Sequence, residues 1–208
     1  MTSITPKPLR ADARRNRQLV LDAARERFAR DGTTAQIDDI AAAAGVGVGT
    51  VYRHFETKDA LVRALADEHF AEKAEIAERA LEIEDPWEAF CTFMREGAEH
   101  QAANRALAAF TADRPEVMEE AAIKADRERG FFSTGQQLIY RAQEAGALRP
   151  EFELEDIPSI MCAVGGLQSS GGMYADWRRL LEFALDGLRA SAAGPRKLPP
   201  ILERLPRR

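Results

Sequence analysis

The chain has 208 residues, of which 45% are hydrophobic and 30% are charged, and its formal net charge is −5 at pH 7. This composition is typical of a soluble globular protein with one or two small domains, and the acidic balance excludes a wholly basic nucleic-acid coat protein. No apolar run approaches the roughly 20 residues that a membrane helix needs, and the N-terminus lacks the apolar stretch of a secretory signal, so we expect a cytoplasmic protein with no membrane partner.

The charge is unevenly distributed along the chain. Residues 1–17 hold five basic residues and one acidic residue, and residues 1–60 hold ten basic and eight acidic residues, so residues 61–208 carry the negative net charge. A mildly basic head on an acidic body suggests that only the head meets a polyanion.

Helix-forming residues dominate the sequence, and no alternating strand pattern of useful length occurs, so the sequence predicts an all-α fold. The first helix is expected at about 14–30, before Gly32, and the second at 37–44, before Gly45. Their apolar stripes are formed by Val20, Leu21, Ala24 and Phe28, and by Ile37, Ile40, Ala41 and Ala44.

The later helices follow from the same periodicity and from helix start and stop signals. A short helix is expected at 48–54 and a long one at 58–83; Asp85 then caps the next helix, which has Pro86 in its first position. Further helices are predicted at about 86–101, 104–111, 115–145, 155–173 and 176–191, and the last residues form a proline-rich tail.

The segments 37–44 and 48–54 are two short helices joined by about three residues that include glycine, which is the pattern of a helix-turn-helix motif. In the second helix Val51 and Phe55 are four residues apart, so they share one face, which is expected to pack inward. The same rotation turns four hydrogen-bonding side chains outward: Thr50, Tyr52, Arg53 and His54. Such groups suit phosphate oxygens and base edges, and Gly49 would let the helix approach DNA closely.

The stretch "IDDIAAAAGVGVGTVYRHFETKDALV" resembles the N-terminal DNA-binding domain of TetR-family transcriptional regulators, and the likeness extends over about residues 14–65. The resemblance implies a homodimeric repressor, or less often an activator, that binds a near-palindromic operator in double-stranded DNA. It also implies an all-helical C-terminal domain for ligand binding and dimerisation. We therefore expect a helix-turn-helix domain with a basic N-terminal arm at 1–60, the ligand-binding and dimerisation helical bundle at 61–193 and, from its prolines, an irregular tail at 194–208.

The resemblance further implies which residues meet DNA. In the family, the residues at the positions of Val48 and Gly49 approach bases. The residues that commonly contact phosphates or base edges match Thr50, Tyr52, His54 and Lys58, and Arg53 is at a variable contact position. Gln36 replaces the usual Thr or Ser cap of the second helix, a role that Thr33 or Thr34 could take, and Val48 replaces a lysine and could contact a thymine methyl. The predicted DNA-binding residues are Thr34, Gln36, Val48, Gly49, Thr50, Tyr52, Arg53, His54 and Lys58.

The basic residues Arg14, Arg15 and Arg17 allow two interpretations: phosphate contacts, or the solvated start of a helix. The last two predicted helices resemble those that pair with their twins in a family dimer, as a four-helix bundle. The first has small residues at Ala163, Gly165 and Gly166, and the second has an apolar stripe of Leu180, Phe183, Ala184 and Leu188.

The middle helices are rich in aromatic and thioether side chains, some of which could line a pocket for an apolar or amphipathic small-molecule effector. For any single residue a place in the plain core is the better interpretation, and His100 could be a polar anchor or a surface residue. The candidate pocket residues are Phe90, Phe93, Met94, His100, Phe110, Met118 and Phe131.

Two other functions compete with a ligand-responsive regulator. An enzyme is disfavoured because the three histidines lie far apart and no nucleophile elbow, phosphate loop or dinucleotide motif occurs. A helical module that binds a protein partner is the other alternative. Cys91 and Cys162 lack metal-ligand spacing and are predicted to be reduced core thiols, so neither a metal nor a cofactor is expected.

Overall fold

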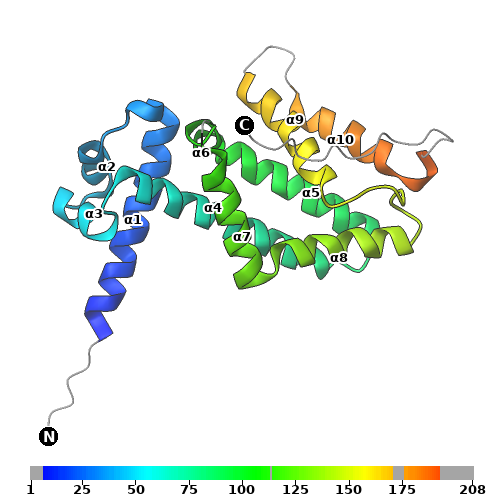
Figure 1. Ribbon diagram of the computed structural model, residues 1–208, viewed down its shortest axis with the longest axis horizontal. Helices are drawn as coiled ribbons and strands as arrows, with labels where there is room; N and C mark the ends of the chain where they lie inside the picture. The colour runs from blue at the N-terminus through cyan, green and yellow to red at the C-terminus, as the bar shows by residue number, and fades with distance from the viewer. Residues whose placement is uncertain (1–6, 113, 171–175, 193–208) are drawn as a thin grey trace, which may run out of the picture. The chain divides into compact units, whose positions relative to one another are not determined.

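The computed structural model describes residues 7–112, 114–170 and 176–192, which form ten α-helices and two short 3₁₀ helices (Figure 1). The prediction of an all-α fold is therefore confirmed. None of these described helices is long and apolar enough to cross a membrane. The elements are α1 (Lys7–Asp31), η1 (Gly32–Thr34), α2 (Ile37–Ala44), α3 (Val48–His54), α4 (Lys58–Leu81), α5 (Pro86–Ala103), α6 (Arg105–Phe110), α7 (Pro115–Arg129), α8 (Phe131–Glu144), α9 (Asp156–Ser170), α10 (Trp177–Leu188) and η2 (Ala190–Ala192).

Most helix boundaries agree with the sequence pattern, and α2 and α3 agree residue for residue. Asp85 caps α5, since its carboxylate accepts a hydrogen bond from the Glu88 amide at 2.8 Å. At the N-terminus α1 starts at Lys7, so most of the expected basic arm is helical. The predicted tail at 194–208 lies outside the described residues.

The prediction of one helix at 115–145 is wrong, because the chain turns at Gly130 and forms α7 and α8 instead. Gly130 has φ = 65°, a left-handed conformation that glycine adopts without steric cost. Asp126 fixes this corner: its carbonyl accepts from the Gly130 amide at 2.7 Å, and its carboxylate accepts from the Phe132 amide at 2.8 Å.

The contacts divide the chain into two compact units, and the first contains residues 1–70 and 104–124. It includes α1–α3, the first half of α4, α6 and most of α7. Its core is larger than a domain ending near residue 60 would allow, because Leu61, Leu65, Leu107 and Val117 are buried in one cluster with Phe28. Two helices from the middle of the sequence thus complete the core of the helix-turn-helix unit.

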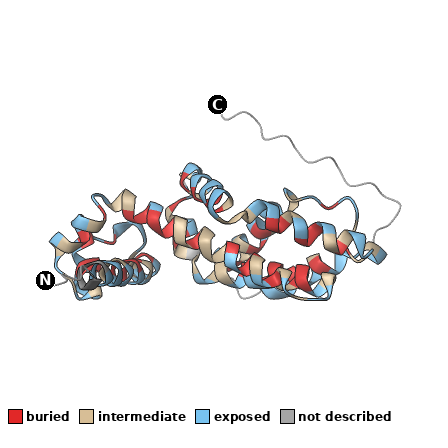
Figure 2. Cartoon of the chain, turned by 90° about the horizontal axis from the view of Figure 1, so that it is seen from below, coloured by how far each residue is buried: buried red, intermediate tan, exposed pale blue. Residues whose placement is uncertain are grey.

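The second unit contains residues 71–103 and 125–208 and has its own core on α5, α8, α9 and α10. Figure 2 shows buried residues along the helix faces that meet one another and exposed residues on the outer faces. The largest fully buried side chains of this core are Phe90, Met94, Leu138, Ile139, Leu148, Leu181 and Leu185. Cys91 is buried as predicted, but Cys162 is exposed, so the prediction of a core thiol is wrong there; both thiols are free.

Two glutamines join α5 to α9 in this second unit. Gln101 of α5 donates to the Met161 carbonyl at 2.9 Å, and Gln168 of α9 donates to the Ala98 carbonyl at 3.0 Å. Gly165 lies one turn after Met161, and a Cβ there would be only 2.5 Å from the Gln101 amide nitrogen. The small residue predicted to allow close helix approach therefore leaves room for this hydrogen-bonded glutamine.

Candidate nucleic-acid interface

The turn between α2 and α3 is fixed by glycine at the end of α2. Gly45 has φ = 68°, its amide donates to the Ala42 carbonyl at 3.2 Å, and the Val46 amide donates to the Ala41 carbonyl at 3.0 Å. These two bonds form a Schellman motif, which ends the helix and satisfies its last carbonyls. Because α3 begins at Val48, three residues after Gly45, a local glycine signal sets the spacing of the motif.

The orientation of α3 agrees with the apolar pattern of its sequence. Val51 is 0% and Phe55 is 4% exposed, so these two side chains anchor the helix in the core of the first unit. Tyr52 is 48% exposed, and Arg53 beside it is exposed as well. Neither Tyr52 nor Arg53 forms a side-chain hydrogen bond or ion pair within the described part of the chain, so their polar groups are available to another molecule.

The other residues of the predicted DNA-binding face on α3 have mixed environments. Gly49 is exposed, Thr50 and His54 are half-buried, and Val48 is half-buried against the core of the unit. A Cβ built on Gly49 would meet no atom within 4 Å, so the fold itself does not require glycine at this position. The structure therefore brings together on one helix six of the nine residues predicted to bind DNA.

Two of the remaining three residues precede α2. Thr34 and Gln36 are exposed, but neither side chain caps α2: the Thr34 hydroxyl donates to the Asp31 carbonyl at 2.6 Å, and the Gln36 amide donates to the Thr34 carbonyl at 2.7 Å. Both side chains hold the connecting segment together. The third residue is Lys58, whose ammonium group donates to the carbonyls of Thr33 at 2.8 Å and Ala35 at 2.6 Å.

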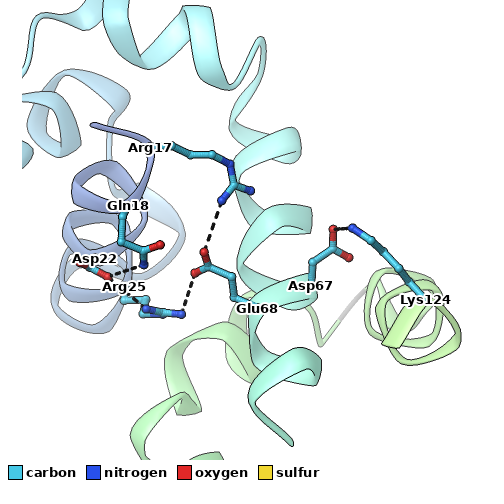
Figure 3. Close-up of polar contacts among 7 residues, drawn as sticks. All are labelled: Arg17, Gln18, Asp22, Arg25, Asp67, Glu68 and Lys124. Carbon is cyan, nitrogen blue, oxygen red and sulfur yellow. Dashed lines mark hydrogen bonds and ion pairs between the residues drawn. The ribbon is translucent and has the colours of Figure 1, made fainter. Parts of the chain in front are cut away.

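Ion pairs that the sequence analysis missed hold α1 against the rest of the unit. Glu68 of α4 accepts from Arg25 at 2.8 Å and from Arg17 at 3.4 Å (Figure 3). Arg27 of α1 lies 3.1 Å from Asp39 of α2. Arg17 thus has a partner within the fold and also lies over the Phe55 ring at 5.3 Å. No local pattern could have revealed these pairs, because the partners are far apart in the sequence.

Comparison with known proteins shows the family of the chain. Residues 20–65 match the family described as bacterial regulatory proteins, tetR family, and residues 85–190 match the C-terminal domain of SbtR-like transcriptional regulators. The chain belongs to the TetR family of transcriptional regulators. It is therefore a DNA-binding regulator of the repressor type and not an enzyme.

Individual relatives agree with this assignment. The HTH-type transcriptional repressor LfrR of Mycolicibacterium smegmatis is 34% identical over 140 residues, which are 66% of this TetR-family chain and 69% of the relative. The HTH-type transcriptional regulator SAR0097 of Staphylococcus aureus is 38% identical over 78 residues, only 36% of this chain and 38% of that protein.

Solved structures share the fold over most of the chain. The crystal structure of a TetR transcription regulatory protein from Mycobacterium vanbaalenii is 37% identical, has a TM-score of 0.65, and is matched over 88% of this chain and 99% of its own. The regulator SCO0520 from Streptomyces coelicolor is 27% identical with a TM-score of 0.61, matched over 83% of this chain and 98% of its own.

The seven candidate effector residues of this TetR-family chain are divided between the two units. Phe90, Phe93 and Met94 are buried in the core of the second unit, His100 is largely buried on the same helix, and Phe131 is half-buried at the start of α8. In contrast, Phe110 and Met118 pack against the core of the first unit. The prediction that some of the seven line an effector pocket stays a prediction, and Phe110 and Met118 belong to the unit that holds the helix-turn-helix.

Proposed function

We propose that this TetR-family chain is a homodimeric, sequence-specific repressor that leaves a near-palindromic operator when a small apolar or amphipathic effector binds its second unit. Its site of action would be the cytoplasm, where bacterial DNA lies. One observation carries the proposal: α3 buries Val51 and Phe55 and presents Tyr52 and Arg53 to the outside. A helix anchored in this way can place its outer face in a major groove.

The proposed DNA face consists of α3 and the segment before α2. Tyr52 and Arg53 would reach phosphates or base edges, and Gly49 would let the backbone of α3 come close to the bases. Thr50, His54 and Val48 flank them on the same helix, and Thr34 and Gln36 would touch the adjacent backbone. Arg14 and Arg15 are exposed on α1 and could add phosphate contacts.

The proposed dimer forms through α9 and α10. Trp177, Leu181 and Leu185 are buried on the inner face of α10, whereas Phe183 is 60% and Leu180 is 37% exposed. A large exposed aromatic residue on a helix whose other face is already packed is typical of a subunit interface. Ala163 and Gly166, exposed on α9, would allow the partner helices to approach closely.

The proposed effector site lies on α5 in the second unit. Phe93 and Met94 supply apolar surface, and His100 supplies a polar group whose Nδ1 atom lies 3.3 Å from a Glu72 carboxylate oxygen. An effector that binds the released form better than the operator-bound form would shift the population away from DNA.

The DNA-binding proposal is tested with duplexes that the purified protein selects from a random pool, and with the intergenic DNA upstream of its own gene. Binding should fall steeply as salt rises, because phosphate contacts release counterions. Tyr52→Ala should weaken binding at least about tenfold, whereas Tyr140→Ala, at an exposed tyrosine of α8, should not. The proposal is wrong if the folded dimer enriches no duplex at low salt.

The effector proposal is tested with dodecanol and dodecanoate, one uncharged and one anionic probe with the same apolar chain, added to the protein–duplex complex. At least one of them should release the duplex at concentrations below its micelle or solubility limit. Met94→Trp, which adds side-chain volume at a buried position of the proposed site, should blunt release without weakening binding to the duplex. Release that is equally strong with Met94→Trp would place the effector elsewhere.

A further inference from the structure

We infer that Lys58 is a positioning residue for DNA binding rather than a phosphate contact, and that Phe110 of α6 completes the site that holds it. The inference rests on the proposed DNA-binding function. It assigns a role in operator recognition to Phe110, which lies more than fifty positions beyond α3 in the sequence.

The ammonium group of Lys58 is directed toward the segment that precedes α2. It donates hydrogen bonds to the carbonyl oxygens of Thr33 and Ala35, and the Gln36 side-chain amide donates to the carbonyl oxygen of Thr34. Three consecutive carbonyls are thus bound by side chains immediately before α2 begins. Since this segment leads directly into the helix-turn-helix, Lys58 fixes where α2 starts.

Two aromatic rings form the rest of the Lys58 environment. The ammonium nitrogen lies 5.3 Å from the ring centroid of Phe110 and 5.8 Å from that of Phe28, and the two rings lie 4.8 Å apart. These distances are within the range of cation–π attraction. Partial burial lowers the pKa of Lys58, in agreement with an ammonium group that has lost part of its water.

Phe110 is itself held by the other end of the α6–α7 connection. The Arg114 guanidinium lies over its ring at 5.4 Å and also pairs with Asp59, the neighbour of Lys58. To reach a phosphate, Lys58 would have to leave two carbonyls and two rings. Its contribution to DNA binding would therefore pass through the position of α2 and α3, and it would depend on Phe110.

The test measures the affinity of folded dimer for a duplex selected by the wild-type protein, at KCl concentrations from about 50 to about 300 mM. Lys58→Met should weaken binding about tenfold at every concentration, leaving the slope of log affinity against log salt unchanged. The matched control Arg53→Gln should reduce the slope by about 0.9 for each phosphate that the protein no longer neutralises. A merely structural role of Lys58 would lower the melting temperature but not the affinity of protein that is still folded.

Two further variants decide between the interpretations. Lys58→Arg keeps the charge but not the shape that fits the carbonyls and rings, so it should not restore affinity; Phe110→Leu should weaken binding in the wild type but not in Lys58→Met. Three outcomes would each overturn the inference. The first is wild-type affinity of Lys58→Met or Lys58→Arg, the second is a reduced salt slope for Lys58→Met, and the third is additivity of the effects of Lys58→Met and Phe110→Leu. If Lys58→Met does not fold, Lys58→Arg and Phe110→Leu still decide. Failure of the wild type to select any duplex would instead count against the proposed function.

Discussion

Arg25 of α1 donates to Glu68 of α4 at 2.8 Å, and this contact joins the first helix of the DNA-binding unit to the long helix that follows the helix-turn-helix (Figure 3). Glu68 also accepts a hydrogen bond from Arg17, so a single carboxylate contacts two positions of α1 that are eight residues apart. The carboxylate is 21% exposed, so it is less screened by water than an ordinary surface ion pair.

Glu68→Gln should lower the free energy of unfolding by about 1 kcal/mol, because two arginines lose a charged acceptor in a partly buried site. The control is Asp67→Asn on the adjacent residue, whose pair with Lys124 is more exposed and should contribute less than about 0.5 kcal/mol. Chemical denaturation of the full chain measures both. Equal effects of the two substitutions would show that burial does not distinguish these pairs.

Gly49→Ala should separate folding from DNA binding. Alanine is a better helix former than glycine and meets no atom within 4 Å at this position, so stability should stay unchanged or rise by up to about 0.5 kcal/mol. Binding to the selected duplex should nevertheless weaken about tenfold if α3 approaches the bases closely. Thermal melting and duplex titration of the same sample provide the comparison, and undiminished binding would remove Gly49 from the DNA face.

Gly130→Ala should destabilise the corner between α7 and α8. The left-handed conformation costs a residue with a Cβ about 1–2 kcal/mol, and the added Cβ would lie only 2.8 Å from the Ser133 hydroxyl oxygen. The control Gly187→Ala lies in α10 with open space around it and should not destabilise the fold. A melting temperature for Gly130→Ala at or above that of the wild type would contradict this account of the corner.

Phe183→Glu should convert the proposed dimer into monomer. The substitution removes a central aromatic side chain and places a charge in a twofold interface. It should therefore weaken association by at least about 2 kcal/mol, or roughly 30-fold. Tyr140→Glu is the control, since Tyr140 on α8 is 57% exposed and lies outside the proposed interface. Sedimentation velocity over a concentration series should show dissociation of the Phe183 variant alone. The opposite pattern would move the interface from α10 to α8.

Lys73 on α4 should make stability depend on pH, because burial lowers its pKa to about 8, although the nearby Cys162 opposes the shift. Between about pH 8 and the ordinary lysine value of about 10.4, the unfolded chain binds more protons than the folded chain, so the contribution of Lys73 to unfolding free energy rises with pH. Below pH 8 the lysine is protonated in both states, so the full free-energy cost of burying its charge is present. Lys73→Met should therefore be more stable than the wild type at pH 7, by on the order of 1–3 kcal/mol.

The same advantage of Lys73→Met should shrink as the pH is raised from 8 toward 10. Urea denaturation of both proteins at pH 7, 8, 9 and about 10 gives the difference directly, and it cancels groups that the two chains share. Lys124→Met, at an exposed lysine of α7, is the surface control. A difference between Lys73→Met and the wild type that stays constant over this range would exclude the burial of Lys73 as the cause.

The sequence by itself determined the helix-turn-helix, because every signal there is local. Gly45 ends α2, the four-residue spacing of Val51 and Phe55 rotates α3, and that rotation leaves Tyr52 and Arg53 outside. The family resemblance could be stated from these same residues. The corner at Gly130 had a local signal too, yet the continuous helical pattern on both sides hid it.

Only the tertiary structure decided which distant residues meet. It packed Phe110 and Met118 against the core of the first unit, turned Lys58 toward backbone carbonyls, and gave Arg17 a carboxylate partner in Glu68. Periodicity reports which face of a helix is apolar, but not which partner covers that face. Ion pairs between helices that are distant in the sequence leave no local signal, so this pairing follows only from the way the helices pack.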